Sequence, residues 1–496
     1  MWDEEDVALI DSHGERDVES LDPIESPNET DGRHLGLTSA VFLILNRMIG
    51  TGVFSIPSSI YQLTGSVGWS LVLWICGGLI ACCGFSVYLE YGLQMPFSGG
   101  EKNYLDRVYT NPPKLALTIF TVVTALLSFS TSNSFAFGNY LQMGLGLEPE
   151  ISATRWIGCI TVGLVCLLHS RFPHAGRTAF NVLGFAKVFI LALIASTGPL
   201  LALGIIKIDG GNVAHHNFGE MWKNDGFGGG LYDIGVALMR ISYSYRGWET
   251  CNMVLGELED PERTIKRAGI IALATITALY TLCNYAYFAA IYKEDVANSG
   301  VLIAGVFLLK LFGESTASHV LPLIICVSNL GNILVVTYAL SRVVQELGKH
   351  DILPFSKFLA SDKPWKTPAA ALFMHFVMTV LTLTLPPPGD IYNFVVDLST
   401  YPVAIFATMI TIGLILVHRN PDKYSWNPEK SYRAPLIGMI VFLISNFMML
   451  VFPWIPPQIP KTGLPYYASP LASVLLIFVG LGYWCIRHND YLHGHT

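Results

Sequence analysis

The sequence predicts an all-α polytopic membrane protein with twelve transmembrane helices, and three observations support this fold class. The chain of 496 residues is 52% hydrophobic and only 14% charged, whereas a soluble domain carries about 25% charged residues. Its apolar residues gather into stretches long enough to cross a bilayer, which takes about 20 residues. The first and the sixth of these stretches are interrupted near their middle by glycine-containing segments.

Twelve stretches fit the length of a membrane span. In chain order, the predicted spans are 37–63, 67–94, 115–145, 155–170, 177–206, 231–256, 268–292, 318–347, 367–386, 391–418, 434–454 and 465–487. The fourth is short, and the remaining loops are too short to hold a sizeable soluble domain. The sequence contains no Walker motif, metal-ligand spacing or basic nucleic-acid stripe. We therefore expect neither an enzyme nor a bound cofactor, metal or nucleic acid.

The distribution of basic residues predicts that both chain termini face the cytosol. With the N-terminus inside, the inner tails and loops hold 20 of the 30 Lys and Arg residues, and an excess of these residues marks cytosolic loops. The first 35 residues carry twelve acidic residues against two arginines, a net charge of −10. This segment has few apolar residues to bury, so we expect a disordered cytosolic tail without a cleavable signal peptide.

The first span is broken at Ile49–Phe54. Lipid cannot satisfy free backbone groups, so non-helical backbone at this depth must be buried in protein or line a cavity. Amides that follow such a break suit a carboxylate, and carbonyls that precede it suit an ammonium group, as an amino-acid zwitterion requires. The candidate substrate-binding residues here are Met48, Ile49, Gly50, Thr51, Gly52 and Val53.

The sixth span is broken at Tyr243–Trp248. Two interrupted helices at corresponding positions of two halves indicate the substrate site of a secondary transporter. The alternative is that the glycines only let helices pack closely. The candidate substrate-binding residues here are Tyr243, Ser244, Tyr245, Arg246 and Gly247.

Several motifs occur in a fixed order along the chain. They are Asn46–Pro57; Glu90–Gly92 with Ser98–Tyr104; Gly247–Trp248 with Gly256–Pro261 and Arg263; and Ser328–Gly331 with Leu340–Arg342, Gly348 and Leu353–Pro354. In this order they resemble the first, second, sixth and eighth helices, with their following loops, of the amino acid–polyamine–organocation (APC) superfamily. The chain is most similar to the L-type branch, and Ser98–Tyr104 most resembles the fungal high-affinity methionine permeases.

The resemblance implies a LeuT-like fold with a 5+5 inverted repeat and two further helices. Alternating access would follow, with a bundle containing helices 1 and 6 moving against a scaffold containing helices 3 and 8. The corresponding organisation is a tail at 1–35, a first repeat at 36–206 and an outer loop at 207–230, then a second repeat at 231–418, helices 11 and 12 at 419–487 and a cytosolic tail at 488–496.

Four residues are candidates for coupling or gating. Lys187, ten residues into the fifth span, matches a lysine that in sodium-independent relatives occupies the region of a sodium ion. It would either exchange a proton or tie its helix to carbonyls of helices 1 and 8. Glu90 matches a superfamily glutamate near the cytosolic gate, and Tyr243 matches an aromatic gate over the substrate. Glu249 is the fourth candidate.

Arg246 and Glu249 depart from the neutral residues that are common at this point of related sixth helices. Charges at membrane depth are costly, by at least about 2.5–3.5 kcal/mol on insertion scales. Two interpretations are open. The two side chains pair with each other on one helical turn, or one of them tunes substrate selectivity or proton coupling.

These observations predict a proton-coupled symporter that imports neutral amino acids, with methionine as the first candidate substrate. The alternatives are an exchanger of the same fold and a sensor that binds amino acids without moving them. The plasma membrane fits the resemblance best, and a vacuolar membrane would share every physical feature. The outer loop 144–155 contains no cysteine, so we expect no disulfide-linked heavy chain.

Overall fold

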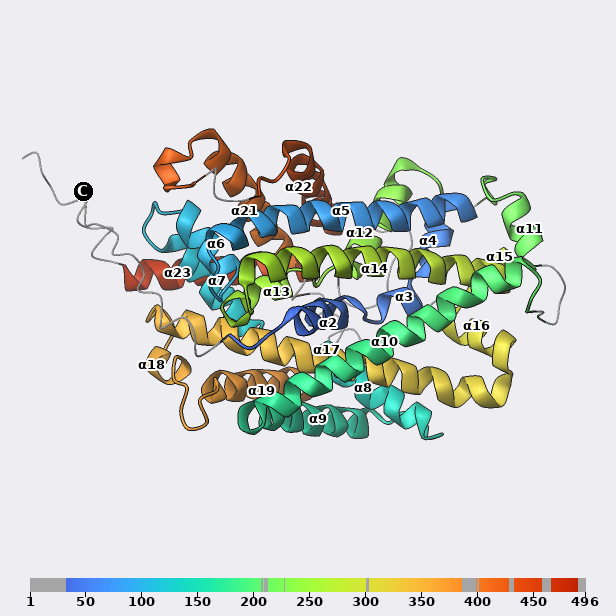
Figure 1. Cartoon of the computed structure of the whole chain (residues 1–496), viewed down its shortest axis with the longest axis horizontal. Coiled ribbons are helices and arrows are strands. Elements are labelled where there is room, and N and C mark those ends of the chain that lie inside the picture. The colour runs from blue at the N-terminus through green and yellow to red at the C-terminus, as the bar shows by residue number, and fades with distance from the viewer. Residues whose placement is uncertain are drawn as a thin grey trace, which may run out of the picture.

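Long helices that run side by side make up most of the chain, as the computed structural model shows (Figure 1). It describes residues 33–206, 208, 213–226, 228–299, 303–385, 398, 401–427, 432–456 and 465–488. The predicted tails at 1–35 and 488–496 lie almost wholly outside these residues. Within the described part, pairing of the β type is confined to an isolated bridge between Leu35 and Leu258.

The elements of the first half are α2 (Leu37–Met48), α3 (Gly52–Ser55), α4 (Pro57–Thr64), α5 (Val67–Gln94), α6 (Glu101–Val108), α7 (Leu115–Leu126), α8 (Thr131–Gly144), α9 (Ile151–Arg171), α10 (Pro173–Ala202), α11 (Val213–Gly219) and α12 (Leu231–Ser244). Those of the second half are α13 (Thr250–Met253), η2 (Leu255–Glu257), α14 (Pro261–Ala290), α15 (Lys293–Ser299), α16 (Ile303–Phe312), α17 (Glu314–Lys349), α18 (Ser356–Leu359), α19 (Ala369–Thr384), α21 (Tyr401–Arg419), η4 (Asp422–Tyr424), α22 (Leu436–Val451), η5 (Phe452–Trp454) and α23 (Ala468–Arg487).

Ten helical segments of the described chain are long and apolar enough to cross a membrane, so the protein is polytopic. They are Leu37–Ser55, Val67–Gln94, Leu115–Gly144, Ile151–Arg171, Pro173–Ala202, Pro261–Ala290, His319–Lys349, Tyr401–Arg419, Leu436–Trp454 and Ala468–Arg487. The other two predicted spans, 231–256 and 367–386, contain α12 and α19, which have only 14 and 16 residues. The sixth span is short because α12 ends at the predicted break.

The outer helices carry their apolar side chains on the surface. On α9, Ile160 and Leu164 are 59% and 61% exposed, and on α10, Phe185 and Phe189 are 63% and 53% exposed. A spacing of four residues places each pair on one face of its helix. Large apolar surfaces of this kind suit contact with lipid, in agreement with a membrane protein.

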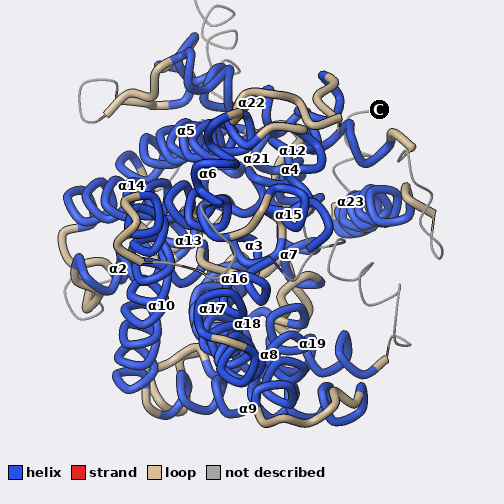
Figure 2. Tube along the Cα trace, turned by 90° about the vertical axis from the view of Figure 1, so that its right-hand side faces the viewer, coloured by secondary structure: helices blue, strands red, loops and turns tan. Residues whose placement is uncertain are grey.

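The broken first helix lies at the centre of the bundle. Its half-helix α2 packs against α10, α14 and α17, and the view along the bundle shows α17 and α10 beside it (Figure 2). We refer to the side of the molecule with α6 and α18, at the left of Figure 1, as the α6 end, and to the side with α11 and α15, at the right, as the α15 end. The break between α2 and α3 lies between these two ends.

Two features of the fold differ from the sequence expectation. The third span is also interrupted, because α7 ends at Leu126 and α8 begins at Thr131. The loop expected between the seventh and eighth spans contains α15 and the apolar helix α16. The serines at 128 and 130 hydrogen-bond the buried His375 of α19, so side chains stabilise the chain where the helix is interrupted.

Candidate functional site

A cavity of about 360 Å³ lies where the interruptions of the first, third and sixth spans meet. Pockets for small molecules have volumes of about 300–1,000 Å³. Eight of the predicted residues line it, namely Met48, Gly50, Thr51, Gly52, Tyr243, Ser244, Arg246 and Glu249. The other six do not line it, namely Ile49, Val53, Glu90, Lys187, Tyr245 and Gly247. The structure therefore brings residues of both breaks together at one cavity.

Glycines allow the two breaks to touch each other. A Cβ on Gly52 would lie 2.4 Å from Oγ of Ser244, and a Cβ on Gly247 would lie 2.6 Å from Cγ of Arg47. Gly247 also has a φ of +131°, which side chains with a Cβ rarely adopt. Gly50 differs, since a Cβ there would meet only Nδ2 of Asn332, at 3.6 Å. Close packing thus explains Gly52 and Gly247, while Gly50 borders the cavity.

The carbonyl of Ile49, which the break releases from helical pairing, is bound by three side chains. It accepts hydrogen bonds from Nζ of Lys187 at 3.0 Å, Oγ of Ser328 at 3.1 Å and Nδ2 of Asn332 at 3.1 Å. Lys187 also donates to the carbonyl of Asn46 at 2.9 Å. These are the contacts of a structural tie from α10 to the first helix. Two donors from α17 complete this arrangement around the Ile49 carbonyl.

The carbonyl of Met48 also has a protein partner, because the Tyr280 hydroxyl donates to it at 2.7 Å. The two carbonyls that the sequence offered to an ammonium group are thus already occupied. On the other side of the break, Thr51, Gly52 and Val53 begin α3, where the first amides of a helix lack intrahelical acceptors. The chain continues helically into α4, with the Ile56 amide donating to the Gly52 carbonyl at 3.0 Å. The amide side of the break is therefore the more available for a ligand.

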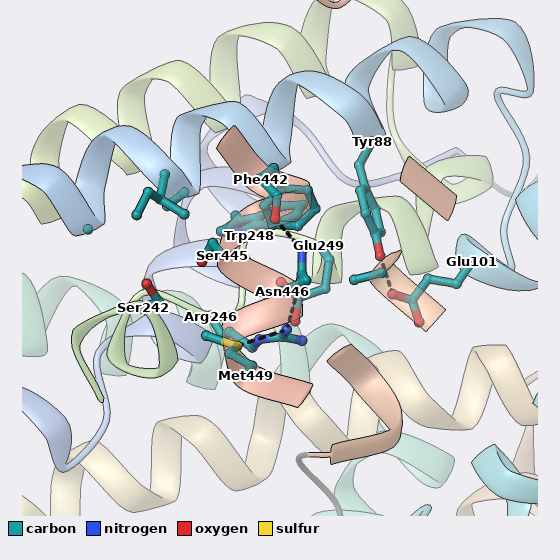
Figure 3. Close-up of a pocket in the computed structure, with 14 residues that line it drawn as sticks. Tyr88, Glu101, Ser242, Arg246, Trp248, Glu249, Phe442, Ser445, Asn446 and Met449 are labelled. Atoms are coloured by element: carbon teal, nitrogen blue, oxygen red, sulfur yellow. Dashed lines mark hydrogen bonds between the residues drawn. The ribbon is translucent and has the colours of Figure 1, made fainter. Parts of the chain in front are cut away.

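Arg246 and Glu249 line the cavity, and they also line the smaller pocket that Figure 3 shows. Arg246 donates to Oδ1 of Asn446 at 3.1 Å, and Glu249 accepts from the Gly247 amide at 2.9 Å. The structure gives no ion pair between these two described side chains. The interpretation that they pair with each other is therefore wrong, because each is held by a different neighbour.

The other predicted residues have distinct surroundings. Tyr243 is 53% exposed at the cavity, whereas Tyr245 is buried and donates to the Trp74 carbonyl at 2.9 Å. Glu90 accepts hydrogen bonds from Trp426 at 3.2 Å and from the Ala434 amide at 2.6 Å, and its Oε1 lies 2.8 Å from Nε2 of His418. Glu90 thus joins α5 to the segment that connects α21 and α22, away from the cavity.

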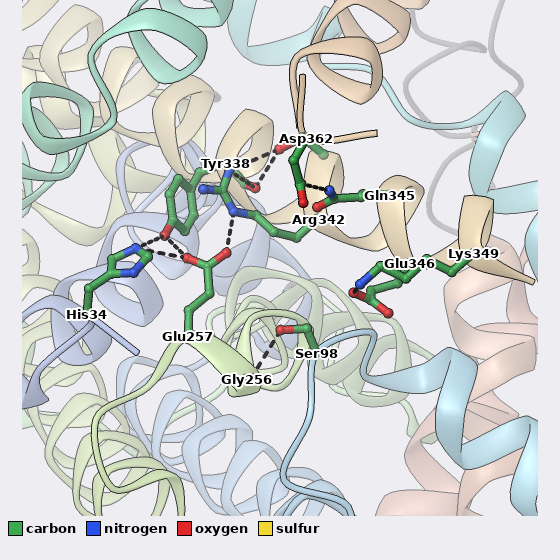
Figure 4. Close-up of polar contacts among 11 residues, drawn as sticks. His34, Ser98, Gly256, Glu257, Tyr338, Arg342, Gln345, Glu346, Lys349 and Asp362 are labelled. Carbon is green, nitrogen blue, oxygen red and sulfur yellow. Dashed lines mark hydrogen bonds and ion pairs between the residues drawn. The ribbon is translucent and has the colours of Figure 1, made fainter. Parts of the chain in front are cut away.

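Polar contacts join distant segments of the chain at the α6 end of the molecule (Figure 4). Glu257 pairs with Nε of Arg342 at 2.7 Å and with Nε2 of His34 at 3.2 Å, and it accepts a hydrogen bond from the Tyr338 hydroxyl. The Arg342 guanidinium lies 3.6 Å from the centre of the Tyr338 ring. The Leu35 amide donates to the Glu257 carbonyl at 2.9 Å. We call His34, Glu257, Tyr338 and Arg342 the α6-end latch.

The latch carboxylate is strongly ionised. Burial by itself would raise the pKa of Glu257, but Arg342 and His34 lower it to about 2 from the usual 4.5. Because the pKa in the folded protein lies below the usual value, the contribution of Glu257 to stability is present above about pH 4.5. It is lost only as the pH falls toward 2. Glu257 therefore stays ionised at physiological pH.

Sequence reasoning missed the latch and one acidic residue at the cavity, Glu101. All of these except His34 and Tyr338 belong to motifs that carried the family resemblance, but a motif does not show which side chains meet. Glu257 and Arg342 are 85 residues apart in the chain. Their opposite charges next to membrane spans were the available signal, since charges at such positions are costly unless paired.

The fold and this cavity define a polytopic membrane protein with a cavity of small-molecule size inside its helix bundle. A family model for amino acid permeases matches residues 35–483, and the chain belongs to this family. It is 32% identical over 479 residues to the high-affinity methionine permease of Saccharomyces cerevisiae, covering 96% of this chain and 82% of the relative. Identity to the low-affinity methionine permease of the same yeast is 29%, covering 92% and 82%. Identity to the b(0,+)-type amino acid transporter 1 of Rattus norvegicus is 25%, covering 94% and 90%.

We predict that Gly52→Ala lowers the melting temperature of the purified protein in detergent. The new methyl group would overlap Ser244 and push the two breaks apart, and such overpacking costs about 1–3 kcal/mol. Gly50→Ala is the matched control, because its methyl group has room and we expect an unchanged melting temperature. Equal effects of the two substitutions would contradict a contact specific to Gly52.

We predict that Glu257→Gln opens the α6 end. Removing one member of a buried ion pair costs about 3–5 kcal/mol, and this cost falls on the closed arrangement. A cysteine introduced by Val343→Cys at the cavity should then react with a water-soluble maleimide about tenfold faster or more.

Glu220→Gln is the control for this prediction, because Glu220 and its partner Lys223 are 57% and 62% exposed and surface pairs contribute only about 0–1 kcal/mol. The same protein without the introduced cysteine corrects for native thiols. Equal labelling rates with and without Glu257→Gln would show that the latch does not hold this end closed.

Proposed function

We propose that this protein is a secondary active transporter that imports neutral amino acids, with methionine as the first candidate, by alternating access coupled to protons. The observation that carries this proposal is the cavity between the two breaks, which has the size of a small-molecule site. The printed names of the two yeast relatives support methionine as the substrate to test first.

Each break would bind a different end of the substrate. The substrate carboxylate would face the amides of Thr51, Gly52 and Val53 at the start of α3. The ammonium would face the carbonyl end of α12, at Tyr243 and Ser244, because both residues line the cavity. Ile49 does not line it, and its carbonyl accepts three side-chain donors. An uncharged side chain would lie against the apolar lining residues Phe120, Val123, Val336, Leu340 and Phe406.

The proposed architecture is the LeuT-like arrangement of twelve spans, with α12 and α19 as shortened members. The repeats would be 36–206 and 231–418, and the α6 end would face the cytosol. Closure of that end by the α6-end latch, with Tyr243 exposed at the cavity, suits a state that receives substrate from outside. Alternating access would then require the latch to separate. Lys187 would hold the first break in place, and Tyr243 would cover the bound substrate.

The proposal further assigns the protein to the plasma membrane as a transporter without a disulfide-linked heavy chain. The outer loop 144–155 contains no cysteine that could join such a chain. The proton gradient across that membrane would supply the driving force, since the sequence contains no Walker motif for ATP.

The deciding experiment is uptake of radiolabelled methionine into proteoliposomes with an inward proton gradient and no internal amino acid. Accumulation above equilibrium that a protonophore abolishes would establish proton-coupled import. Uptake that requires preloaded amino acid would identify an exchanger and overturn the coupling. Binding without flux under either condition would identify a sensor and overturn transport.

We predict that Gly50→Ala raises the KM for methionine by about tenfold or more, because one added methyl group changes discrimination at a close-fitting site by about 10–200-fold. Initial rates of uptake over a range of methionine concentrations test this. The fold should be intact, since the new Cβ has ordinary contacts. An unchanged KM would place the substrate away from Gly50.

A further inference from the structure

A buried acid lies beside the cavity without a cationic partner. Glu101, the first residue of α6, is only 8% exposed, and its carboxylate accepts a hydrogen bond from the Tyr88 hydroxyl of α5 (Figure 3). Among the described residues it forms no ion pair. A buried carboxylate is costly unless it is paired or takes up a proton.

Glu101 also joins two spaces inside the protein. Together with Arg246 and Glu249 it lines the main cavity, and the same three residues line a second cavity of about 20 Å³. The smaller cavity is bordered as well by the polar side chains of Tyr88, Ser242 and Asn446 and by apolar ones such as Trp248 and Phe442. A polar space of about 10–15 Å³ or more can hold one water molecule. Protons could therefore pass between the main cavity and the Glu101 carboxyl group.

The groups around Glu101 leave its two protonation states close in free energy. Burial raises its pKa, the hydrogen bond from Tyr88 lowers it, the charge of Glu249 raises it and that of Arg246 lowers it, which together give a pKa of about 7. Tyr104 of α6 also faces this carboxyl group, with Cys251 of α13 beside it. The side chains that α7 and α21 present to the cavity do not titrate; they are Phe120, Val123, Thr124, Pro402, Val403 and Phe406.

The neighbouring charged groups are engaged elsewhere. Lys102, next in sequence, has its Nζ 2.8 Å from Nε2 of His350, and Lys187 is tied to carbonyls of the first helix. Arg246 donates to Asn446. Glu249, whose carboxylate binds the Gly247 amide, lies in the break of the sixth helix that the proposed transport cycle moves. A change in that break would alter the charge that acts on Glu101.

We propose that the Glu101 carboxyl group is the proton-binding site that couples the proton gradient to transport, with Glu249 and Tyr88 setting its affinity. The inference rests on the proposed proton-coupled import and names the group that carries the proton. Water on the outer side of the cavity gives a proton to a carboxylate oxygen of Glu101. The proton then leaves to cytosolic water after the α6 end opens.

The test compares two assays of methionine in proteoliposomes, accumulation driven by a proton gradient and counterflow exchange without a gradient. Glu101→Gln should keep counterflow within about threefold and lose accumulation above equilibrium. Its rates should also lose their pH dependence between about pH 6 and 8. Glu262→Gln, an exposed carboxyl group at the start of α14, is the matched control and should behave as the native protein. Accumulation by Glu101→Gln equal to the native level would overturn the inference.

Tyr88→Phe gives a second readout that does not depend on the folding of Glu101→Gln. Loss of the Tyr88 hydrogen bond removes an influence that lowers the pKa of Glu101, so the midpoint of the pH dependence should move to higher pH. An unmoved midpoint would contradict the assignment. If the native protein itself does not accumulate methionine, the proposed symport fails. The role of Glu101 is then tested by the pH dependence of counterflow. A pH dependence that is present in the native protein and absent in Glu101→Gln would support proton binding by Glu101. The same pH dependence in both proteins would overturn it.

Discussion

The structure depends on satisfying one carbonyl in the middle of the bundle. Breaking the first helix frees the carbonyl of Ile49 at a depth where lipid offers no donor, and an unsatisfied backbone group there would cost several kcal/mol. Three side chains from α10 and α17 donate to it. This arrangement gives the buried amino group of Lys187 its acceptors and anchors the first helix to both neighbours. The amide side of the same break remains free to line a cavity.

A second constraint is the direct contact between the two breaks. Gly52 lies against Ser244, and Gly247 lies against Arg47, so neither break can move far without the other. Close helix packing therefore accounts for Gly52 and Gly247, whereas a ligand site is needed to account for Gly50. A movement of the first helix would be transmitted to the sixth through this contact. Coupled movement of two broken helices is what the proposed alternating access requires.

The sequence predicted the class of fold, and eight of its candidate site residues line one cavity, because both the spans and the breaks follow from local patterns. Apolar length located the spans, and the glycine segments at 49–54 and 243–248 located the breaks. Contacts between distant segments could not be predicted in this way. The latch joins residues 34, 257, 338 and 342, and the interruption at 127–130 depends on His375 of another helix. The spacing left open a pair between Arg246 and Glu249, but Arg246 binds the distant Asn446 and Glu249 binds the Gly247 amide.

Glu257 and Glu101, two glutamates near the α6 end, have different proposed roles because their surroundings differ. Glu257 has a guanidinium at 2.7 Å, and its pKa of about 2 keeps it charged through any physiological change in pH. Glu101 has a phenol and a nearby carboxylate but no ion-pair partner among the described residues, and its pKa is about 7. A contact that closes one end of a transporter must not weaken when a proton binds, whereas a coupling group must exchange its proton in each cycle. Placing the two acids in such different electrostatic surroundings meets both requirements.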